Sequence, residues 1–241
     1  MPPPNLILAM DTSGDVCSVA LFRNGRFHAE LAFRHEMHLS ERLISHVDLL
    51  LTELSATLHD VDCFVVGTGP GSFTGTRIGV MTMKTFAFVQ EKPIVAINGL
   101  EAMAAEYCGM PGVTVTPVLA CRTGFVYACP FSVEGDYPAP LAEPNAFTFG
   151  ELGEVLQRVD GGTLLFCGPA ARRYEADLRA SLGERGVAAA FGAVEFPRAA
   201  SLGRLAILRL AFGAAAGSPL DVIPLYISPP PITLPKQPIP T

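Results

Sequence analysis

The sequence predicts an α/β fold in which strands alternate with helices in layers. Short runs of β-favouring apolar residues are followed by segments whose apolar residues recur at helical spacing, and this alternation continues along most of the 241 residues. Hydrophobic residues make up 49 % of the chain and charged residues 17 %, which is enough apolar material for a packed core. We therefore expect one folded unit or two small ones, and not a disordered chain.

The first third of the chain predicts three antiparallel strands followed by a helix. The Asn24-Gly25 pair lies between two β-favouring runs and is typical of a two-residue hairpin turn. From Leu39 the apolar spacing becomes that of an amphipathic helix of about five turns, and Ser40 is a possible cap. The expected strands are residues 6–10, 16–22 and 27–33.

The rest of the chain continues the alternation. Further strands are expected at residues 61–66, 93–97, 113–120, 125–131 and 163–167, and helices at 74–90, 100–107, 151–159, 170–182 and 201–216. The Pro111-Gly112 pair marks a boundary between two lobes. We divide the chain into a first lobe of residues 1–105, a second lobe of 106–228 and a proline-rich tail of 229–241; the helix at 201–216 could pack back on the first lobe.

Composition and patterning exclude several classes of protein. No apolar window reaches the roughly 20 residues that span a bilayer, and the N-terminus lacks the features of a secretory signal, so we expect a cytoplasmic protein without a membrane segment. The net charge of −6 has the wrong sign for a surface that binds RNA by itself. The six cysteines include no Cys-x-x-Cys pair and are expected to be buried, reduced thiols.

No constellation for metal or nucleophilic catalysis is visible in the sequence. His35 and His38 are three residues apart, but no cysteine or second spaced pair completes a four-ligand set, so we expect an exposed histidine pair and no metal site. A Gly-x-Ser-x-Gly nucleophile elbow is also missing, which argues against a serine hydrolase.

The strongest local signal is the Gly-rich segment at residues 67–79, between an expected buried strand and an expected helix. Successive glycines let the backbone come close to a neighbouring group, or to an anion at the helix N-terminus. The segment is not a Walker A loop, because no Gly-Lys-Ser/Thr closes it, and Ser72 stands where the dinucleotide fingerprint needs its last glycine. A tight turn with close helix packing and an anion contact near Gly69, Gly71 and Ser72 are both open interpretations.

A second candidate is the Asp11-Thr12-Ser13 sequence at the end of the first expected strand. A carboxylate and two hydroxyl groups suit a phosphate or a hydrated magnesium ion. Turns favour the same residue types without any ligand. These residues therefore predict either an ordinary turn or, together with the Gly-rich segment, a site for a phosphate group.

The expected helix at residues 74–90 is apolar on nearly all sides. A helix with so little polar face must be covered twice, by the sheet on one side and by a neighbouring helix or a partner protein on another. Methionines such as Met81 suit an adaptable contact. A core role alone and an added partner interface are both compatible with this pattern.

Several blocks of the sequence together resemble the TsaB (YeaZ) family. The blocks are ILAMDTS at residues 7–13, CSVAL at 17–21, SERL at 40–43, VGTGPGSFTGTRIG at 66–79 and LEA at 100–102. Their order and spacing match over roughly the first 105 residues. The resemblance implies a two-lobed actin-like fold of the Hsp70-like ATPase superfold (ASKHA, RNase H-like), with mixed sheets flanked by helices.

The resemblance also implies a function. Members support the formation of N6-threonylcarbamoyladenosine (t6A) in certain transfer RNAs, together with a catalytic TsaD-type subunit, a TsaE-type ATPase and an adenylate made by TsaC. It implies that this chain is a non-catalytic subunit that needs no cofactor of its own and contacts tRNA mainly through the complex. ATP or ADP could bind at the partner interface, and the chain alone could form a homodimer.

Pairing with the catalytic subunit is expected through the helices near residues 39–58 and 74–90, because of their apolar excess. The candidate interface residues are Leu39, Leu43, Val47, Leu50, Arg77, Met81, Lys84 and Phe88. The candidates for lying near a nucleotide or phosphate are Asp11, Thr12, Ser13, Gly69, Gly71 and Ser72.

The second half departs from the family pattern. Ala120 and Phe125 stand where members carry acids, and Ser228 stands where they carry an arginine. The usual His-Ser start of the first helix appears here as Leu39-Ser40. This chain therefore has no acidic side chains at these two positions that could contact a ligand.

Two other functions are weighed against the subunit role. The first is an active ATP-dependent kinase or ATPase of the same superfold that uses Asp11 and the Gly-rich segment, because fold alone does not decide function. The second is a glycoprotease-like peptidase, which would need the His-x-x-x-His metal pair of the catalytic relatives. That pair is missing from the sequence.

Overall fold

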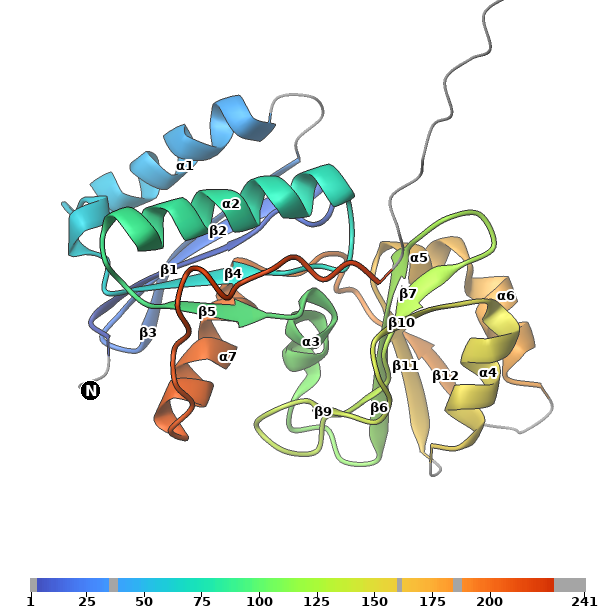
Figure 1. The fold of residues 1–241 in the computed structure, drawn as a ribbon. Helices are drawn as coiled ribbons and strands as arrows, with labels where there is room; N and C mark the ends of the chain where they lie inside the picture. The colour runs from blue at the N-terminus through green and yellow to red at the C-terminus, as the bar shows by residue number, and fades with distance from the viewer. Residues whose placement is uncertain (1–3, 35–38, 160–161, 184–187, 228–241) are drawn as a thin grey trace, which may run out of the picture.

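The computed structural model describes residues 4–34, 39–159, 162–183 and 188–227. Among these residues the strands form two sheets flanked by helices, which gives two α/β lobes side by side (Figure 1). The predicted fold class is thereby confirmed. His35, His38, Ser228 and the proline-rich tail lie outside the described residues. No helix in the described part of the chain is long and apolar enough to cross a membrane.

The first sheet is built from the N-terminal strands. Its spatial order is β3 (Arg26–Arg34), β2 (Val16–Arg23), β1 (Leu6–Asp11), β4 (Cys63–Gly67) and β5 (Ile94–Ile97). β1 pairs antiparallel with β2 and parallel with β4, and β2 pairs antiparallel with β3. Asn24 and Gly25 have φ angles of 53° and 72°, as a two-residue hairpin turn requires. The three predicted antiparallel strands and their hairpin are confirmed.

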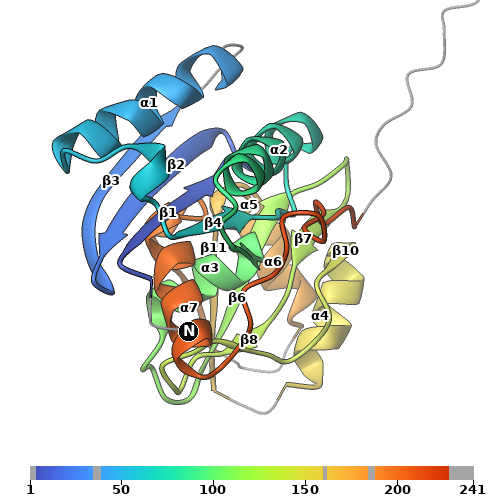
Figure 2. The same ribbon diagram turned by 60° about the vertical axis from the view of Figure 1, so that its left-hand side comes forward.

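Helices cover both faces of the first sheet. α1 (Leu39–Glu53) and α2 (Phe73–Val89) lie on one face, and α7 (Ala199–Ala211) lies on the other (Figure 2). Leu8 and Met10 of β1 pack in the core beneath α1 and α2, whereas Ile7 and Ala9 pack in the core that contains α7. A strand buried on both faces explains why residues 6–10 form an unbroken apolar run.

The first helix is shorter than the sequence predicts. α1 ends at Glu53, because Ser55 adopts a left-handed backbone (φ 50°) that stops the helix. A short 3₁₀ turn, η1 (Leu58–Asp60), follows and begins at Thr57, whose backbone amide donates to the Asp60 carboxylate (2.8 Å). The polar segment after α1 is therefore a separate turn that returns the chain to β4.

The second sheet carries the other lobe. Its spatial order is β10 (Asn145–Phe147), β7 (Val126–Ala128), β6 (Val113–Ala120), β11 (Thr163–Cys167) and β12 (Ala189–Phe191), with β8 (Phe131–Ser132) beside β6 and β9 (Ala139–Pro140) beside β8. β6 and β11 occupy the same residues as predicted. The single strand predicted at 125–131 is instead the two strands β7 and β8, and β9, β10 and β12 were missed because they are two or three residues long.

Short helices cover the second sheet. They are α3 (Gly99–Ala104), α4 (Phe149–Gln157), α5 (Pro169–Arg173) and α6 (Glu175–Ser181). The one helix predicted at 170–182 is broken into α5 and α6 at Tyr174, whose φ and ψ of −114° and 28° are not helical. Leu100 and Met103 of α3 pack with Val115 of β6, so α3 lies between the two lobes.

The last helix, α7, follows the second lobe in sequence but packs on β1, β2 and β4 of the first lobe. Gly203 permits this close approach, because a Cβ there would lie 2.1 Å from Cε2 of Phe22. The helix stops at Ala211, before Gly213 with its φ of 85°, and is shorter than the predicted 201–216.

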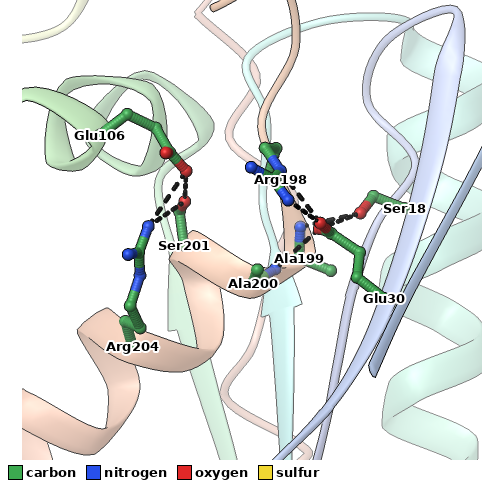
Figure 3. Close-up of polar contacts among 8 residues, drawn as sticks. All are labelled: Ser18, Glu30, Glu106, Arg198, Ala199, Ala200, Ser201 and Arg204. Atoms are coloured by element: carbon green, nitrogen blue, oxygen red, sulfur yellow. Dashed lines mark hydrogen bonds and ion pairs between the residues drawn. The ribbon is translucent and has the colours of Figure 1, made fainter. Parts of the chain in front are cut away.

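Side chains of the first sheet cap the N-terminus of α7 (Figure 3). The Ala199 amide donates to Ser18 Oγ (3.0 Å), and the Ala200 amide donates to Glu30 Oε1 (3.0 Å). Arg198 Nε donates to Oε2 of the Glu30 carboxylate (3.0 Å), and Ser18 Oγ donates to Oε1 (2.8 Å). A carboxylate at this position satisfies free amides and complements the helix dipole.

Replacing this cap should destabilise the protein. Glu30→Ala is expected to lower the free energy of unfolding by about 2–3 kcal/mol, because a buried carboxylate that accepts several hydrogen bonds is lost. Glu154→Ala, on the exposed surface of α4, is the control and should change stability by no more than about 0.5 kcal/mol. Urea unfolding measures both values. Equal effects of the two variants would show that Glu30 does not hold α7 in place.

Two further polar clusters join α7 to its surroundings. Glu106 of η2 (Ala105–Tyr107) is hydrogen-bonded to Ser201 and forms an ion pair with Arg204 (3.2 Å), as Figure 3 shows. Arg209 Nη2 lies 2.7 Å from each carboxylate oxygen of Glu101 in α3.

Tyr137 completes the second cluster. Its hydroxyl accepts a hydrogen bond from Arg209 Nε (2.7 Å) and donates one to Glu101. Burial, followed by the hydrogen bond to Glu101, raises the pKa of Tyr137 to about 12. Because Tyr137 lies between β8 and β9, the cluster connects α7 and α3 to the second lobe.

Candidate functional site

The Gly-rich segment docks against the turn that follows β1. The Ser72 amide donates to the Ser13 carbonyl oxygen (2.7 Å), and Thr12 Oγ1 donates to the Gly75 carbonyl oxygen (2.7 Å). Ser72 also caps α2, since its Oγ accepts a hydrogen bond from the Gly75 amide (3.2 Å). The structure therefore brings Ser72 next to Thr12 and Ser13, which are far from it in the sequence.

The glycines of this segment allow the two backbones to touch. A Cβ at Gly71 would lie 2.2 Å from the Ser13 carbonyl oxygen, and one at Gly75 would lie 2.3 Å from the Thr12 carbonyl oxygen. Gly69 has a φ of 87°, a conformation that favours glycine. These contacts give the glycines a packing role, which favours the tight-turn interpretation. An anion contact near Gly69, Gly71 and Ser72 stays a prediction.

Asp11 is completely buried beneath this contact. Its Oδ1 accepts hydrogen bonds from the Ser13 amide and hydroxyl (2.8 Å each), while Oδ2 has no hydrogen-bond partner among the described residues. A Cβ at Gly67 would lie 1.8 Å from Oδ2, so the carboxylate is pressed against the end of β4. Burial raises the pKa of Asp11 to about 6, although the bonds from Ser13 oppose the shift.

Asp11→Asn is expected to stabilise the protein more as the pH rises. The pKa of the carboxyl group rises from 3.8 to about 6 on folding, so the stability that Asp11 contributes is fully present below the lower value and is lost as the pH rises through the higher one. Asparagine does not ionise. The free energy of unfolding of the variant, relative to that of wild type, should therefore rise by about 1 kcal/mol from about pH 5 to about pH 7. Urea unfolding at both pH values tests this. A difference that does not change with pH would contradict the raised pKa.

Among the described residues, Asp11 belongs to no group of acidic, histidine or cysteine side chains that could hold a metal ion. Within the described residues no group of three His, Cys, Asp or Glu side chains is arranged to do so. Cys17, Cys63, Cys129 and Cys167 are buried, as predicted, and burial raises the pKa of each thiol. Raised pKa values leave these thiols protonated and unreactive near neutral pH. The prediction was wrong for Cys108 and Cys121, which are only partly buried.

The structure corrects half of the interface candidates. Leu39, Leu43, Val47 and Leu50 lie in the core between α1 and the first sheet, so they contact their own chain and cannot face a partner. The helical period identified the apolar face of α1 correctly, but the sheet of the same chain covers that face.

The candidates on α2 have different positions. Met81 and Phe88 are 52 % and 64 % exposed, and Arg77 is exposed beside them on the outer side of the helix. Lys84 does not point to a partner, because its Nζ donates to the carbonyl oxygens of Val222 (2.6 Å) and Leu220 (3.4 Å).

Three exposed apolar residues were missed: Ile44 and Leu49 of α1 and Val89 of α2. The sequence held a signal for Ile44 and Leu49, since both fall outside the apolar stripe of α1 and yet are not polar. Met81 and Phe88 are two turns apart and share one face of α2, which we call the helix surface. In Figure 2 both helices lie on the outer side of the sheet.

Comparisons with known proteins agree with the geometry. The family model of TsaD, tRNA N6-adenosine threonylcarbamoyltransferase, matches residues 30–155. TsaB of Bacillus subtilis is 30 % identical over 180 residues, which cover 75 % of this chain and 78 % of that protein. TsaB of Escherichia coli is 35 % identical over 122 residues, 50 % of this chain and 52 % of that protein.

Solved structures agree with the fold. The structure of YeaZ from Pseudomonas aeruginosa superposes with a TM-score of 0.75 at 25 % identity, over 92 % of this chain and 99 % of that one. The match to TsaB of Bacillus subtilis covers three quarters of this chain, so it extends well beyond the local motifs. The chain therefore belongs to the TsaB family.

Proposed function

We propose that this chain is a non-catalytic subunit that activates a TsaD-type protein in the t6A modification of transfer RNA. The observation that carries the proposal is the 30 % identity to TsaB of Bacillus subtilis, a tRNA threonylcarbamoyladenosine biosynthesis protein, over three quarters of this chain. The exposed helix surface supplies the physical support, since it leaves an apolar area of a kind that partner proteins cover.

The proposed contact with the TsaD-type subunit is between similar surfaces. The TsaD family model extends over residues 30–155, and so it includes α1 and α2 of this chain. A TsaD-type subunit therefore has counterparts of both helices. Two related surfaces of apolar side chains can pack against each other about an approximate twofold axis, as in an isologous dimer. The same surface would allow a homodimer of this chain when the partner is absent.

The proposal assigns catalysis to the partner. Thr12, Ser13 and the Asp11 Oδ1 atom all form hydrogen bonds within the chain. Backbone atoms of Thr12 and Ser13 occupy the space that a side chain at Gly75 or Gly71 would take. This arrangement suits a rigid support for α2. ATP or ADP would bind at the partner interface, and no cofactor would be needed by this chain alone.

The remaining parts of the proposal concern tRNA and the other subunits. With a net charge of −6, this chain is expected to repel the phosphate backbone, so the complex would hold tRNA mainly through its other subunits. A TsaE-type ATPase is the further partner that we propose, and the cytoplasm is the location in which tRNA modification would take place.

A second candidate function is an ATPase or kinase of the same superfold. The observation that favours it is the buried Asp11, whose Oδ2 lies at the end of β4 without a hydrogen-bond partner among the described residues. Steady ATP turnover by the purified chain, lost in Asp11→Asn, would support this candidate. A peptidase is not proposed, because the sequence lacks the His-x-x-x-His pair of the catalytic relatives.

Reconstitution of the modification tests the proposed function. Purified TsaC-, TsaD- and TsaE-type proteins of the same organism are incubated with tRNA, threonine, bicarbonate and ATP, with and without this chain. We expect t6A to form only when the chain is present. Equal t6A without the chain would contradict the proposal, and the ATPase assay would then be the next test.

A further inference from the structure

A segment that follows α7 runs along α2. Residues 217–227, which we call the strap, cross from the end of α7 to the first lobe (Figure 1). Gly217 forms an antiparallel bridge with Ile94 at the edge strand β5, with N–O distances of 2.9 and 3.2 Å. Farther along, the Leu225 amide donates to the Thr68 carbonyl oxygen (2.9 Å). Both ends of the strap are therefore fixed to the first lobe.

Side chains of α2 hold the middle and the end of the strap. The Lys84 ammonium group binds the carbonyl oxygens of Leu220 and Val222, and the ring of Tyr226 lies on Phe73, with 4.9 Å between the centroids. Because Lys84 follows Phe73 by three turns of α2, the strap runs antiparallel to the helix. These contacts place the strap directly beside the helix surface.

The strap does not pack along its whole length. A cleft of about 660 Å³ lies between it, β5 and the end of α7; its lining includes Thr68, Ala96, Arg209, Leu210 and Ile223. Val222 is buried, whereas the side chains of Leu220 and Ile223 are 71 % and 73 % exposed. A segment anchored at a few points above a cleft depends on each anchor for its order, so Lys84 has a large share in positioning these apolar side chains.

We propose that the strap is the third element of the surface that receives the TsaD-type subunit, an inference that rests on the proposed function. Leu220, Ile223 and Tyr226 are exposed apolar residues of the strap, which Lys84 and Phe73 hold against the helix that carries the exposed Met81 and Phe88. Only Asp221 among residues 217–227 is charged, so the strap is as apolar as the helix surface beside it.

The occupant is a TsaD-type subunit, because the strap is held on α2, the helix whose exposed surface the proposed function assigns to that subunit. Lys84 binds the strap and is three residues from Met81 and four from Phe88 on α2, so a protein that packs on these two side chains would lie next to the strap. Aromatic and aliphatic side chains at the centre of an interface account for most of its binding energy. A second copy of this chain would use the same surface, and the experiment separates the two.

The first test is Ile223→Asp in the full-length chain, measured by calorimetric titration with the TsaD-type subunit. A charge at this exposed position leaves the fold intact but would be buried in the complex, and Kd should rise by at least about tenfold. Leu141→Asp is the control, since Leu141 is exposed on the second lobe, and it should change Kd by less than about twofold. Sedimentation of both variants alone reports any effect on self-association.

The second test removes the anchor. Lys84→Met keeps the aliphatic stem and loses the ammonium group, so hydrogen exchange at the Leu225 amide should become at least about tenfold faster, and Kd should rise. If wild type binds the TsaD-type subunit and Ile223→Asp binds equally well, the strap inference is wrong while the proposed function stands. The inference is also wrong if Ile223→Asp no longer self-associates but keeps the wild-type Kd for the TsaD-type subunit. A wild-type chain that does not bind the TsaD-type subunit contradicts the proposed function and the strap inference together.

Discussion

Met81→Asp is expected to abolish binding of the TsaD-type subunit while the free chain stays folded. Met81 is half exposed on α2, so a carboxylate there keeps its water in the free chain. In the complex the same carboxylate would be buried without a partner, which costs about 3–5 kcal/mol and raises Kd by at least about a hundredfold. Calorimetric titration measures the affinity, and circular dichroism with urea unfolding confirms the fold.

Val47→Asp is the matched control on the neighbouring helix. Val47 is 1 % exposed in the core beneath α1, so a charge there should lower the free energy of unfolding by about 3–5 kcal/mol. The two aspartates thus act on different properties, one on association and the other on the fold. If Val47→Asp were as stable as wild type and only lost its partner, the assignment of this side of α1 to the core would be wrong.

Gly75→Ala is expected to destabilise the protein, against the usual effect of this substitution in a helix. Alanine favours helix over glycine by about 1 kcal/mol. At Gly75, however, the new Cβ would lie 2.3 Å from the Thr12 carbonyl oxygen, a backbone atom that cannot turn aside. α2 would have to move away from β1, and we expect a net loss of about 1–3 kcal/mol in the free energy of unfolding.

Gly150→Ala in α4 provides the control with the opposite sign. Nothing lies within 4 Å of the position that its Cβ would take, so the variant should gain up to about 1 kcal/mol from helix propensity. Urea unfolding of the two variants beside wild type gives the comparison. If both variants were more stable than wild type, α2 and the turn after β1 could move apart at little cost in free energy. The packing role of the glycines would then be contradicted.

Much of the fold could be predicted from local patterns. The strands at 113–120 and 163–167 and the hairpin at Asn24 and Gly25 depend on residue type and alternation within a few positions. α2 was predicted to within one residue at each end. Short and irregular elements were harder to predict: the break at Tyr174 and the very short β9, β10 and β12 have no periodicity that a sequence window could detect.

The candidate site shows the same division. The Gly-rich segment and the Asp11 turn were each visible in the sequence, but their mutual contact was not, since Thr12 and Gly75 are 63 residues apart. The choice between an anion contact and close packing depended on the distances from the glycine Cβ positions to the β1 turn. Sequence alone gave these residues two interpretations, and the nucleotide interpretation stays a prediction.

The sequence by itself determined the α/β class, the order of the main elements and the family, because periodicity and the motif strings are properties of neighbouring residues. Only the tertiary structure decided that α7 packs on the first lobe, that Lys84 holds the strap, and that Met81 is exposed while Val47 is buried. An apolar residue on a helix satisfies the same pattern whether a sheet of its own chain or a partner covers it. Long-range packing, which brings distant segments into contact, makes that choice.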